Sequence, residues 1–103
     1  MRIYLGADHR GYDLKEKIKV YLDGRKWEYE DMGNVNLEAN DDYSDFALKV
    51  AERVSVSASA RGILICANGV GVSIAANKVT GIRCGLGFDT EQIKKARQED
   101  DIN

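Results

Sequence analysis

Apolar residues along the chain recur with two different periods, and the change from one to the other outlines the secondary structure. A helical spacing is carried by two sets of positions: Leu14, Ile18, Tyr21 and Leu22, and then Ala47, Val50, Ala51 and Val54. Short apolar or alternating runs, bounded by glycine and polar residues, predict strands at 2–5, 27–32, 63–65 and 82–86. The pattern therefore predicts that strands and helices alternate.

Residues that favour helix ends set the limits of the predicted helices. Gly24 is a candidate C-terminal cap of the first helix, and Ser44 is a candidate N-cap of the second. A short helix of small residues is predicted from Ser73 to Asn77. Asp89 opens a pattern that resembles a capping box, which predicts a last helix through about Glu99.

Four successive strand–helix units predict a single α/β domain over residues 1–103. A parallel sheet with helices on both faces follows, which is a three-layer α/β/α, Rossmann-like fold with four strands. The run Ile63–Ile65 has no polar residue, as expected for a strand buried on both faces. Such folds bind ligands outside the carboxyl ends of their strands, so the loops that follow the strands are candidate sites.

The composition restricts the class of protein. Of 103 residues, 44% are apolar and 31% are charged, as in a globular domain. The net charge of -2 and the pI near 5.4 give no reason to expect binding to nucleic acid or to an anionic membrane. No apolar run approaches the roughly 20 residues of a membrane span, and the N-terminus lacks a signal peptide's apolar stretch. A cytoplasmic protein is expected.

The two cysteines, Cys66 and Cys84, lack the spacing of a zinc site or a disulfide framework, so no metal site is predicted. Cys66 ends a predicted strand just before a glycine-rich turn, where a helix N-terminus would favour its thiolate. Free cysteines are among the most buried residues. A structural role is therefore the competing interpretation for Cys66, and the only one for Cys84.

The glycine-rich turn after Cys66 is the second candidate for chemistry. Gly69, Gly71 and Ser73 would let successive backbone N–H groups converge on a phosphate or a developing oxyanion. A plain strand-to-helix connection explains the same residues. Ile74 stands where a dinucleotide-binding turn needs a small residue, which argues against that fingerprint.

His9 is the only histidine, and it follows Asp8 in the first loop. The pair could orient a sugar hydroxyl or bind an anion, although an exposed loop histidine is an equally good interpretation. Spacing alone does not distinguish Tyr43, Glu99 or Asp100 from ordinary surface residues.

Three stretches resemble the type B ribose-5-phosphate isomerases and their galactose-6-phosphate isomerase relatives: GADHRGYDLKEKIKVYL near the start, DDYSDFA at 41–47, and GILICANGVGVSIAANKVTGIR from Gly62. The resemblance covers the whole chain. It implies an isomerase of phosphorylated sugars that needs no metal or cofactor, works through an enediolate, and shares its active sites across a homodimer.

The resemblance also implies a role for each matching residue. Cys66 matches the base that moves a proton between C1 and C2 of the sugar. Asp8 and His9 match a substrate-binding pair, with His9 towards the phosphate, and Tyr43 matches a substrate-contacting tyrosine. The loop that holds the enediolate oxygen matches Ala67, Asn68, Gly69, Val70, Gly71 and Ser73.

The sequence departs from the family at several expected site positions. The family's usual Cys-Gly-Thr-Gly reads Cys66-Ala67-Asn68-Gly69 here, and Ser44 replaces a proline. Glu99 and Asp100 stand at the positions of the ring-opening histidine and its neighbouring asparagine. A glutamate could do acid–base work there only if its pKa, about 4.3 in a free side chain, were raised.

Members of the family continue past the position of Asn103 into a fifth strand, phosphate-binding arginines and a C-terminal helix. In the family's strand order, 2-1-3-5-4, the fifth strand separates the third from the fourth. Unpaired backbone groups would be costly in that gap. We therefore expect one of three arrangements: the fourth strand moves beside the third, a partner supplies a strand, or a longer form of the chain supplies it.

Three functions follow in order of preference. The first is an aldose–ketose isomerase for a phosphorylated sugar of the ribose 5-phosphate type, with Cys66 as its base. The alternative is a catalytically weak sugar-phosphate-binding or partner subunit, which Glu99 and Asp100 favour. The third is a nucleotide-binding module that would use the glycine turn and Asp89.

Overall fold

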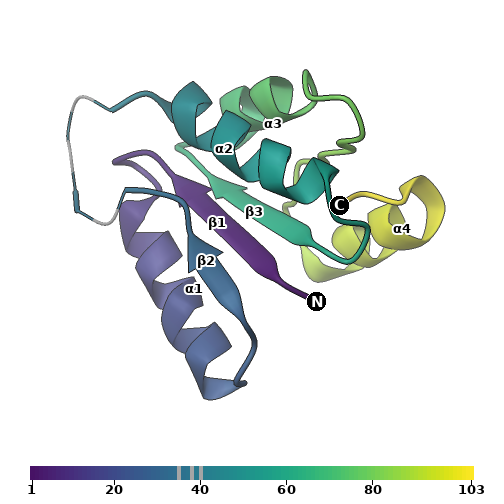
Figure 1. Ribbon diagram of the computed structural model, residues 1–103, viewed down its shortest axis with the longest axis horizontal. Coiled ribbons are helices and arrows are strands. Elements are labelled where there is room, and N and C mark those ends of the chain that lie inside the picture. Colours follow the sequence, from purple (N-terminus) through teal and green to yellow (C-terminus); the bar gives the residue numbers. More distant parts are fainter. Residues whose placement is uncertain (35, 38, 40) are drawn as a thin grey trace.

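The computed structural model describes residues 1–34, 36–37, 39 and 41–103, and Figure 1 shows how they are arranged. This part of the chain contains, in order, β1 (Ile3–Ala7), α1 (Tyr12–Gly24), β2 (Tyr29–Asp31), α2 (Tyr43–Ser55), β3 (Arg61–Ile65), α3 (Val70–Ala76) and α4 (Thr90–Asp100). The predicted α/β fold with a parallel sheet is confirmed.

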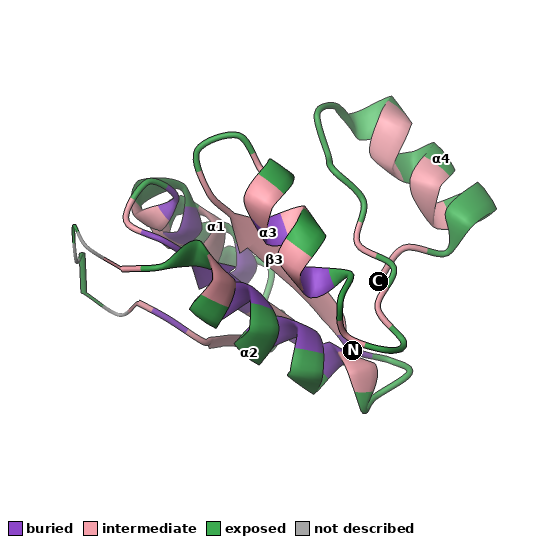
Figure 2. Cartoon of the chain, turned by 90° about the horizontal axis from the view of Figure 1, so that it is seen from above, coloured by how far each residue is buried: buried purple, intermediate pink, exposed green. Residues whose placement is uncertain are grey.

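The strands form one parallel sheet in the order β2-β1-β3. In the central strand, Ile3 lies opposite Tyr29 on one side and Arg61 on the other, and Ala7 lies opposite Ile65 at the carboxyl end. Helix α1 covers one face of the sheet, and α2, with α3 packed against it, covers the other (Figure 2). The structure therefore has the three predicted layers.

The core consists of two apolar clusters, one on each face of the sheet. Ile3 and Leu5 of β1 pack with Leu22 of α1. Tyr4, between them in sequence, packs instead against the cluster around Val50 of α2. Successive side chains of a strand point to opposite faces, so one short strand contributes to both clusters.

The helix ends partly correct the prediction. Asp42, not Ser44, is the N-cap of α2, because the Asp42 carboxylate accepts the backbone N–H of Ser44 at 3.0 Å. Gly24 is the last residue of α1, and Arg25 follows it as the C-cap. The predicted cap at Asp89 is confirmed, since its carboxylate accepts the backbone N–H three residues later at 2.8 Å.

The predicted fourth strand is wrong: residues 82–86 form no strand, so the described sheet has three strands. Side chains satisfy the backbone of this segment instead. The N–H of Cys84 donates to Oδ1 of Asn77 at 2.8 Å, and the carbonyl of Cys84 accepts from Nδ2 of Asn77 at 2.9 Å. An amide side chain here provides the donor and the acceptor that a neighbouring strand would provide.

Asn103 lies between β3 and residues 82–86 and bonds to both. Its carbonyl accepts the N–H of Gly62 at 2.9 Å, and its N–H donates to the carbonyl of Arg83 at 3.0 Å. The arrangement in which the fourth strand moves beside the third is therefore not found. Beyond Gly62, the outer edge of β3 has no strand neighbour in the described chain. All of β3 is half-buried, which corrects the expectation of a strand buried on both faces.

Gly11 provides a test of the packing between α1 and β3. A β-carbon at Gly11 would lie 2.5 Å from the carbonyl oxygen of Ile65. We expect Gly11→Ala to lower the free energy of unfolding by about 1–3 kcal/mol, because β3 cannot shift without disturbing its pairing with β1. Gly24→Ala is the matched control, since nothing lies within 4 Å of a β-carbon there. Urea unfolding compares the two, and equal stabilities would contradict this packing.

Candidate functional site

Two of the predicted site loops follow neighbouring strands whose last residues lie opposite each other. Ala7 and Ile65 are register partners in β1 and β3, so Asp8 and Cys66, which follow them, emerge side by side at the carboxyl edge of the sheet. This is the edge at which open parallel sheets bind ligands. The parallel pairing thus places the Asp8–His9 pair next to the thiol.

Asp8 shapes the first of these loops. It is only 3% exposed, and its Oδ1 accepts the backbone N–H groups of Arg10 at 2.9 Å and Gly11 at 3.1 Å. A carboxylate that caps successive N–H groups fixes the turn into α1. Asp8 therefore holds the backbone on which His9 is presented.

His9 is held by Asp41, a residue that sequence reasoning missed. Oδ1 of Asp41 lies 2.9 Å from both the backbone nitrogen and Nδ1 of His9. The Asp41 side chain is 5% exposed and that of His9 is 30% exposed. The available signal was the pair Asp41–Asp42 in the DDYSDFA stretch, but only the fold shows that Asp42 caps α2 while Asp41 bonds to His9.

The contacts of Asp41 favour the ionised form of its carboxyl group. Burial opposes ionisation, but hydrogen bonds from the side chain and backbone of His9 and from Asn34 outweigh it, so the pKa of Asp41 lies below its usual range. An ionised carboxylate only accepts hydrogen bonds. Nδ1 of His9 must therefore carry the proton in this contact.

The loop after β3 bonds largely to itself. The N–H of Gly69, a residue with φ of 81°, donates to Sγ of Cys66 at 3.2 Å, and the N–H of Val70 donates to Oδ1 of Asn68 at 3.0 Å. The N–H groups of Gly71 and Val72, in the first turn of α3, have no partner among the described residues. These two donors therefore remain without an acceptor in that part of the chain, whereas those of Gly69 and Val70 are engaged.

Tyr43 joins the glycine turn from the other side. It is the first residue of α2, and a β-carbon at Gly71 would lie 2.7 Å from ring carbon Cε1 of Tyr43. Glycine is therefore required where this ring packs on α3. The structure brings Tyr43 to Gly71, close to the loop that begins at Cys66.

Glu99 and Asp100 are not brought to this edge within one chain. Both are exposed and lie at the end of α4, which Figures 1 and 2 show away from the carboxyl ends of the strands. Asp89 is engaged as the cap of α4. Burial raises the pKa of the Cys84 thiol, against a hydrogen bond from Ser73 that lowers it.

A cavity of about 760 Å³ adjoins the outer edge of β3. Its lining includes Leu14 and Ile18 of α1, Ile63, Leu86 and Ile102, and it reaches the Cys66–Gly69 loop. Leu14 belongs to the apolar spacing of α1 but is 53% exposed, because it borders this cavity. The candidate site therefore borders an apolar space on one side.

Metal ligands and membrane spans are not found among the described residues. No group of three or more His, Cys, Asp or Glu residues in these ranges could hold a metal ion. None of the described helices combines the length and the apolar character required to cross a bilayer.

Comparison with known proteins finds a matching family model and similar proteins. The family model described as Ribose/Galactose Isomerase matches residues 3–103. The putative sugar phosphate isomerase YwlF of Bacillus subtilis is 44% identical over 103 residues, which is 100% of this chain and 69% of the relative. Ribose-5-phosphate isomerase B of Mycobacterium tuberculosis is 41% identical over 98 residues, which is 95% of this chain and only 60% of the relative. The chain thus spans about 60–69% of these relatives.

Two solved structures share the fold closely. Ribose-5-phosphate isomerase B of Clostridium thermocellum has a TM-score of 0.94 at 45% identity, covering 100% of this chain and 69% of that one. The Mycoplasma genitalium ribose-5-phosphate isomerase B, solved with bound ribulose-5-phosphate, has a TM-score of 0.94 at 41% identity. The match covers 99% of this chain and 68% of the Mycoplasma chain.

The lowered pKa of Asp41 predicts how acid affects stability. A carboxyl with a folded pKa below its unfolded value, about 3.9, stabilises the fold above that value, and this contribution is lost as pH falls through the folded pKa. We expect the free energy of unfolding to fall more steeply between about pH 5 and about pH 3 in the wild type than in Asp41→Asn. Exposed Asp45→Asn is the control, and equal slopes for wild type and Asp41→Asn would contradict the contact.

Proposed function

Because the chain belongs to the ribose/galactose isomerase family, we propose that it takes a phosphorylated sugar of the ribose 5-phosphate type and interconverts its aldose and ketose forms. The reaction passes through an enediolate, with Cys66 as the base. The observation that carries this proposal is the side-by-side position of the Asp8–His9 loop and Cys66, which follows from the pairing of Ala7 with Ile65.

Proton transfer next to a carbonyl needs one positioned base and donors where negative charge develops. Cys66 supplies a thiol at the end of β3, and it is half-exposed, so a substrate can reach it. The unpartnered N–H groups of Gly71 and Val72 are suited to the enediolate oxygen. Oδ1 of Asn68 accepts the N–H of Val70, and the side-chain Nδ2 of Asn68 can add a further donor.

The other residues bind the substrate in this proposal. His9 meets the phosphate, and Asp8 fixes its loop. Tyr43 contacts the sugar across the turn that holds Gly71. The bound ribulose-5-phosphate of the Mycoplasma genitalium relative supports a pentose phosphate as the ligand class.

A homodimer with shared sites is part of the proposal. Glu99 and Asp100 are exposed and lie away from Cys66 within one chain, so they would act only at the site of a second protomer. Two carboxylates beside a phosphorylated ligand would repel it. A cytoplasmic location fits the two free thiols, Cys66 and Cys84.

An assay on ribose 5-phosphate tests the role of Cys66. We expect Cys66→Ala to lower kcat by about 10²-fold or more, because the variant lacks the thiol that this proposal makes the base. Cys84→Ala is the matched control, since Cys84 lies in the segment tied to Asn77 and keeps wild-type turnover in this proposal. Equal rates for the wild type and Cys66→Ala would eliminate Cys66 as the base.

The second candidate function is a binding or partner subunit without useful turnover. It is favoured by the two acidic side chains, Glu99 and Asp100, at the family's ring-opening positions. Calorimetric binding of ribose 5-phosphate without turnover, even on an open-chain substrate, would support this function over the isomerase.

A further inference from the structure

Lys15 is a buried cation that the proposed reaction does not use. Its side chain is 0% exposed, whereas that of Lys19, one turn later in α1, is 24% exposed. Nζ of Lys15 lies 2.8 and 2.7 Å from the two oxygens of Asp31 and 2.5 Å from the carbonyl oxygen of Asn34. An ammonium has three N–H donors, so each has an acceptor.

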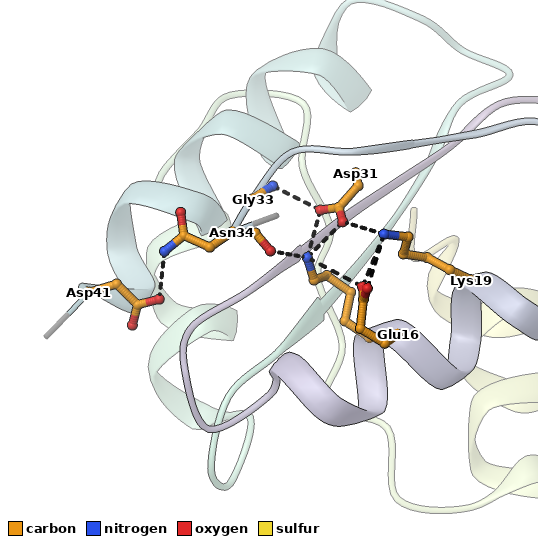
Figure 3. A network of polar contacts seen from close by, with 7 residues as sticks. Glu16, Lys19, Asp31, Gly33, Asn34 and Asp41 are labelled. Carbon is orange, nitrogen blue, oxygen red and sulfur yellow. Dashed lines mark hydrogen bonds and ion pairs between the residues drawn. The ribbon is translucent and has the colours of Figure 1, made fainter. Parts of the chain in front are cut away.

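Asp31 anchors this cation at the end of β2. Its Oδ1 also accepts the N–H of Gly33 at 3.0 Å, and its Oδ2 lies 3.0 Å from Nζ of Lys19 (Figure 3). Burial opposes its ionisation, but the bonds from Lys15, Lys19 and Gly33 together keep the pKa of Asp31 below its usual range. Lys15 is therefore fixed by a charged partner that stays ionised.

Asn34 links Lys15 to Asp41 through two hydrogen bonds. Lys15 holds the backbone carbonyl of Asn34, and the side-chain Nδ2 of Asn34 donates to Oδ2 of Asp41 at 2.9 Å. In Figure 3 the side-chain amide of Asn34 points to Asp41, while its backbone carbonyl, on the other side, accepts from Nζ of Lys15. One residue thus joins the buried ion pair to the loop that meets the site.

Asp41 then fixes His9 at two points. Oδ2 of Asp41 is occupied by Asn34, which leaves Oδ1 for the backbone nitrogen and Nδ1 of His9, both at 2.9 Å. Two contacts from one oxygen restrict both the position of the loop and the rotation of the imidazole. A histidine that bonds through Nδ1–H keeps Nε2 as the nitrogen available to a ligand.

We propose that Lys15 is a positioning residue for His9. It acts through Asn34 and Asp41, which together hold the imidazole as one tautomer, with Nδ1 protonated and Nε2 available to the phosphate of the substrate. Only the identity of that ligand rests on the proposed function. The position of His9 stands on the distances between described residues, and its tautomer follows from the carboxylate that Nδ1 meets.

The chain has a single histidine, so ¹⁵N-histidine labelling gives imidazole NMR signals from His9 alone. Long-range ¹H–¹⁵N spectra, recorded above the pH at which the imidazole titrates, report which nitrogen carries the proton. We expect the Nδ1–H tautomer in the wild type and the loss of that preference in Asp41→Asn and Lys15→Met. Free imidazole side chains favour Nε2–H, so we expect these two variants to show the opposite tautomer from that of the wild type.

Lys19→Met is the matched control for the charge. Lys19 contacts the same oxygen of Asp31, at 3.0 Å, and ion-pairs with Glu16, but no contact joins it to Asn34 or Asp41 within the described chain. We expect its His9 spectrum to match that of the wild type. A reversal in Lys19→Met equal to that in Lys15→Met would overturn the proposal, because any loss of charge in α1 would then have the same effect.

If Lys15→Met does not fold, Asn34→Ala tests whether His9 depends on the link through Asn34. It keeps the ion pair of Lys15 with Asp31 and removes only the amide that holds Asp41. Loss of the Nδ1–H preference in Asn34→Ala supports the proposal. An unchanged spectrum in this variant overturns it, because Asp41 would then hold His9 without help from the buried lysine.

Titration with inorganic phosphate and then with ribose 5-phosphate separates this inference from the proposed function. We expect both ligands to shift the Nε2 signal of the wild type, and to shift it several-fold less in Asn34→Ala at the same concentration. A fixed tautomer with no response to either ligand would sink the substrate role of His9 and leave its positioning intact. Equal shifts in wild type and Asn34→Ala would overturn the link to ligand binding.

Discussion

The parallel pairing of β1 with β3 brings together residues that lie far apart in sequence. Ala7 faces Ile65, and the two chains then leave the sheet as the Asp8–His9 loop and the Cys66 loop. Because parallel strands point the same way, their carboxyl ends meet at one edge, and any chemistry in those loops is shared. Gly11 keeps α1 close against Ile65 at this edge, so the helix and the strand fix the geometry together.

The ion pair between Lys15 and Asp31 contributes more to the position of neighbouring groups than to stability. A buried ion pair adds little net stability relative to an apolar pair, but breaking it by removing one partner leaves a charge without compensation, at a cost of about 3–5 kcal/mol. In this structure the ion pair holds Asn34 in position, and Asn34 in turn holds Asp41. The contacts run from Asp31 through Lys15 and Asn34 to Asp41, and they tie a loop between β2 and α2 to the first loop of the sheet.

The outer edge of β3 is the least constrained part of the sheet. Asn103 provides one backbone partner at Gly62, and the apolar cavity lies beyond it. Residues 82–86 have a strand-like composition but form no strand, because strand propensity describes how well a residue fits a pleated surface with neighbours on both sides. Where the neighbour is missing, Asn77 and Asn103 satisfy the backbone instead.

The sequence by itself determined the alternation of strands and helices, the parallel sheet, and the residues that resemble a sugar-phosphate isomerase. These follow from local spacing and from motifs that are continuous in the chain, such as the run from Gly62 to Arg83. It also predicted that Asp8, His9, Cys66 and Tyr43 belong to one site. The register of β1 and β3 and the packing of Tyr43 on Gly71 are consistent with that prediction.

Only the tertiary structure decided which polar groups meet. Lys15 lies in a stretch of α1 rich in charged residues, yet its side chain is fully buried because Asp31 and Asn34 come to it from another part of the chain. The choice of Asp41 over Asp42 as the partner of His9 likewise depends on where α2 begins. Neighbours in space set burial and hydrogen bonding, and no spacing along the chain specifies them.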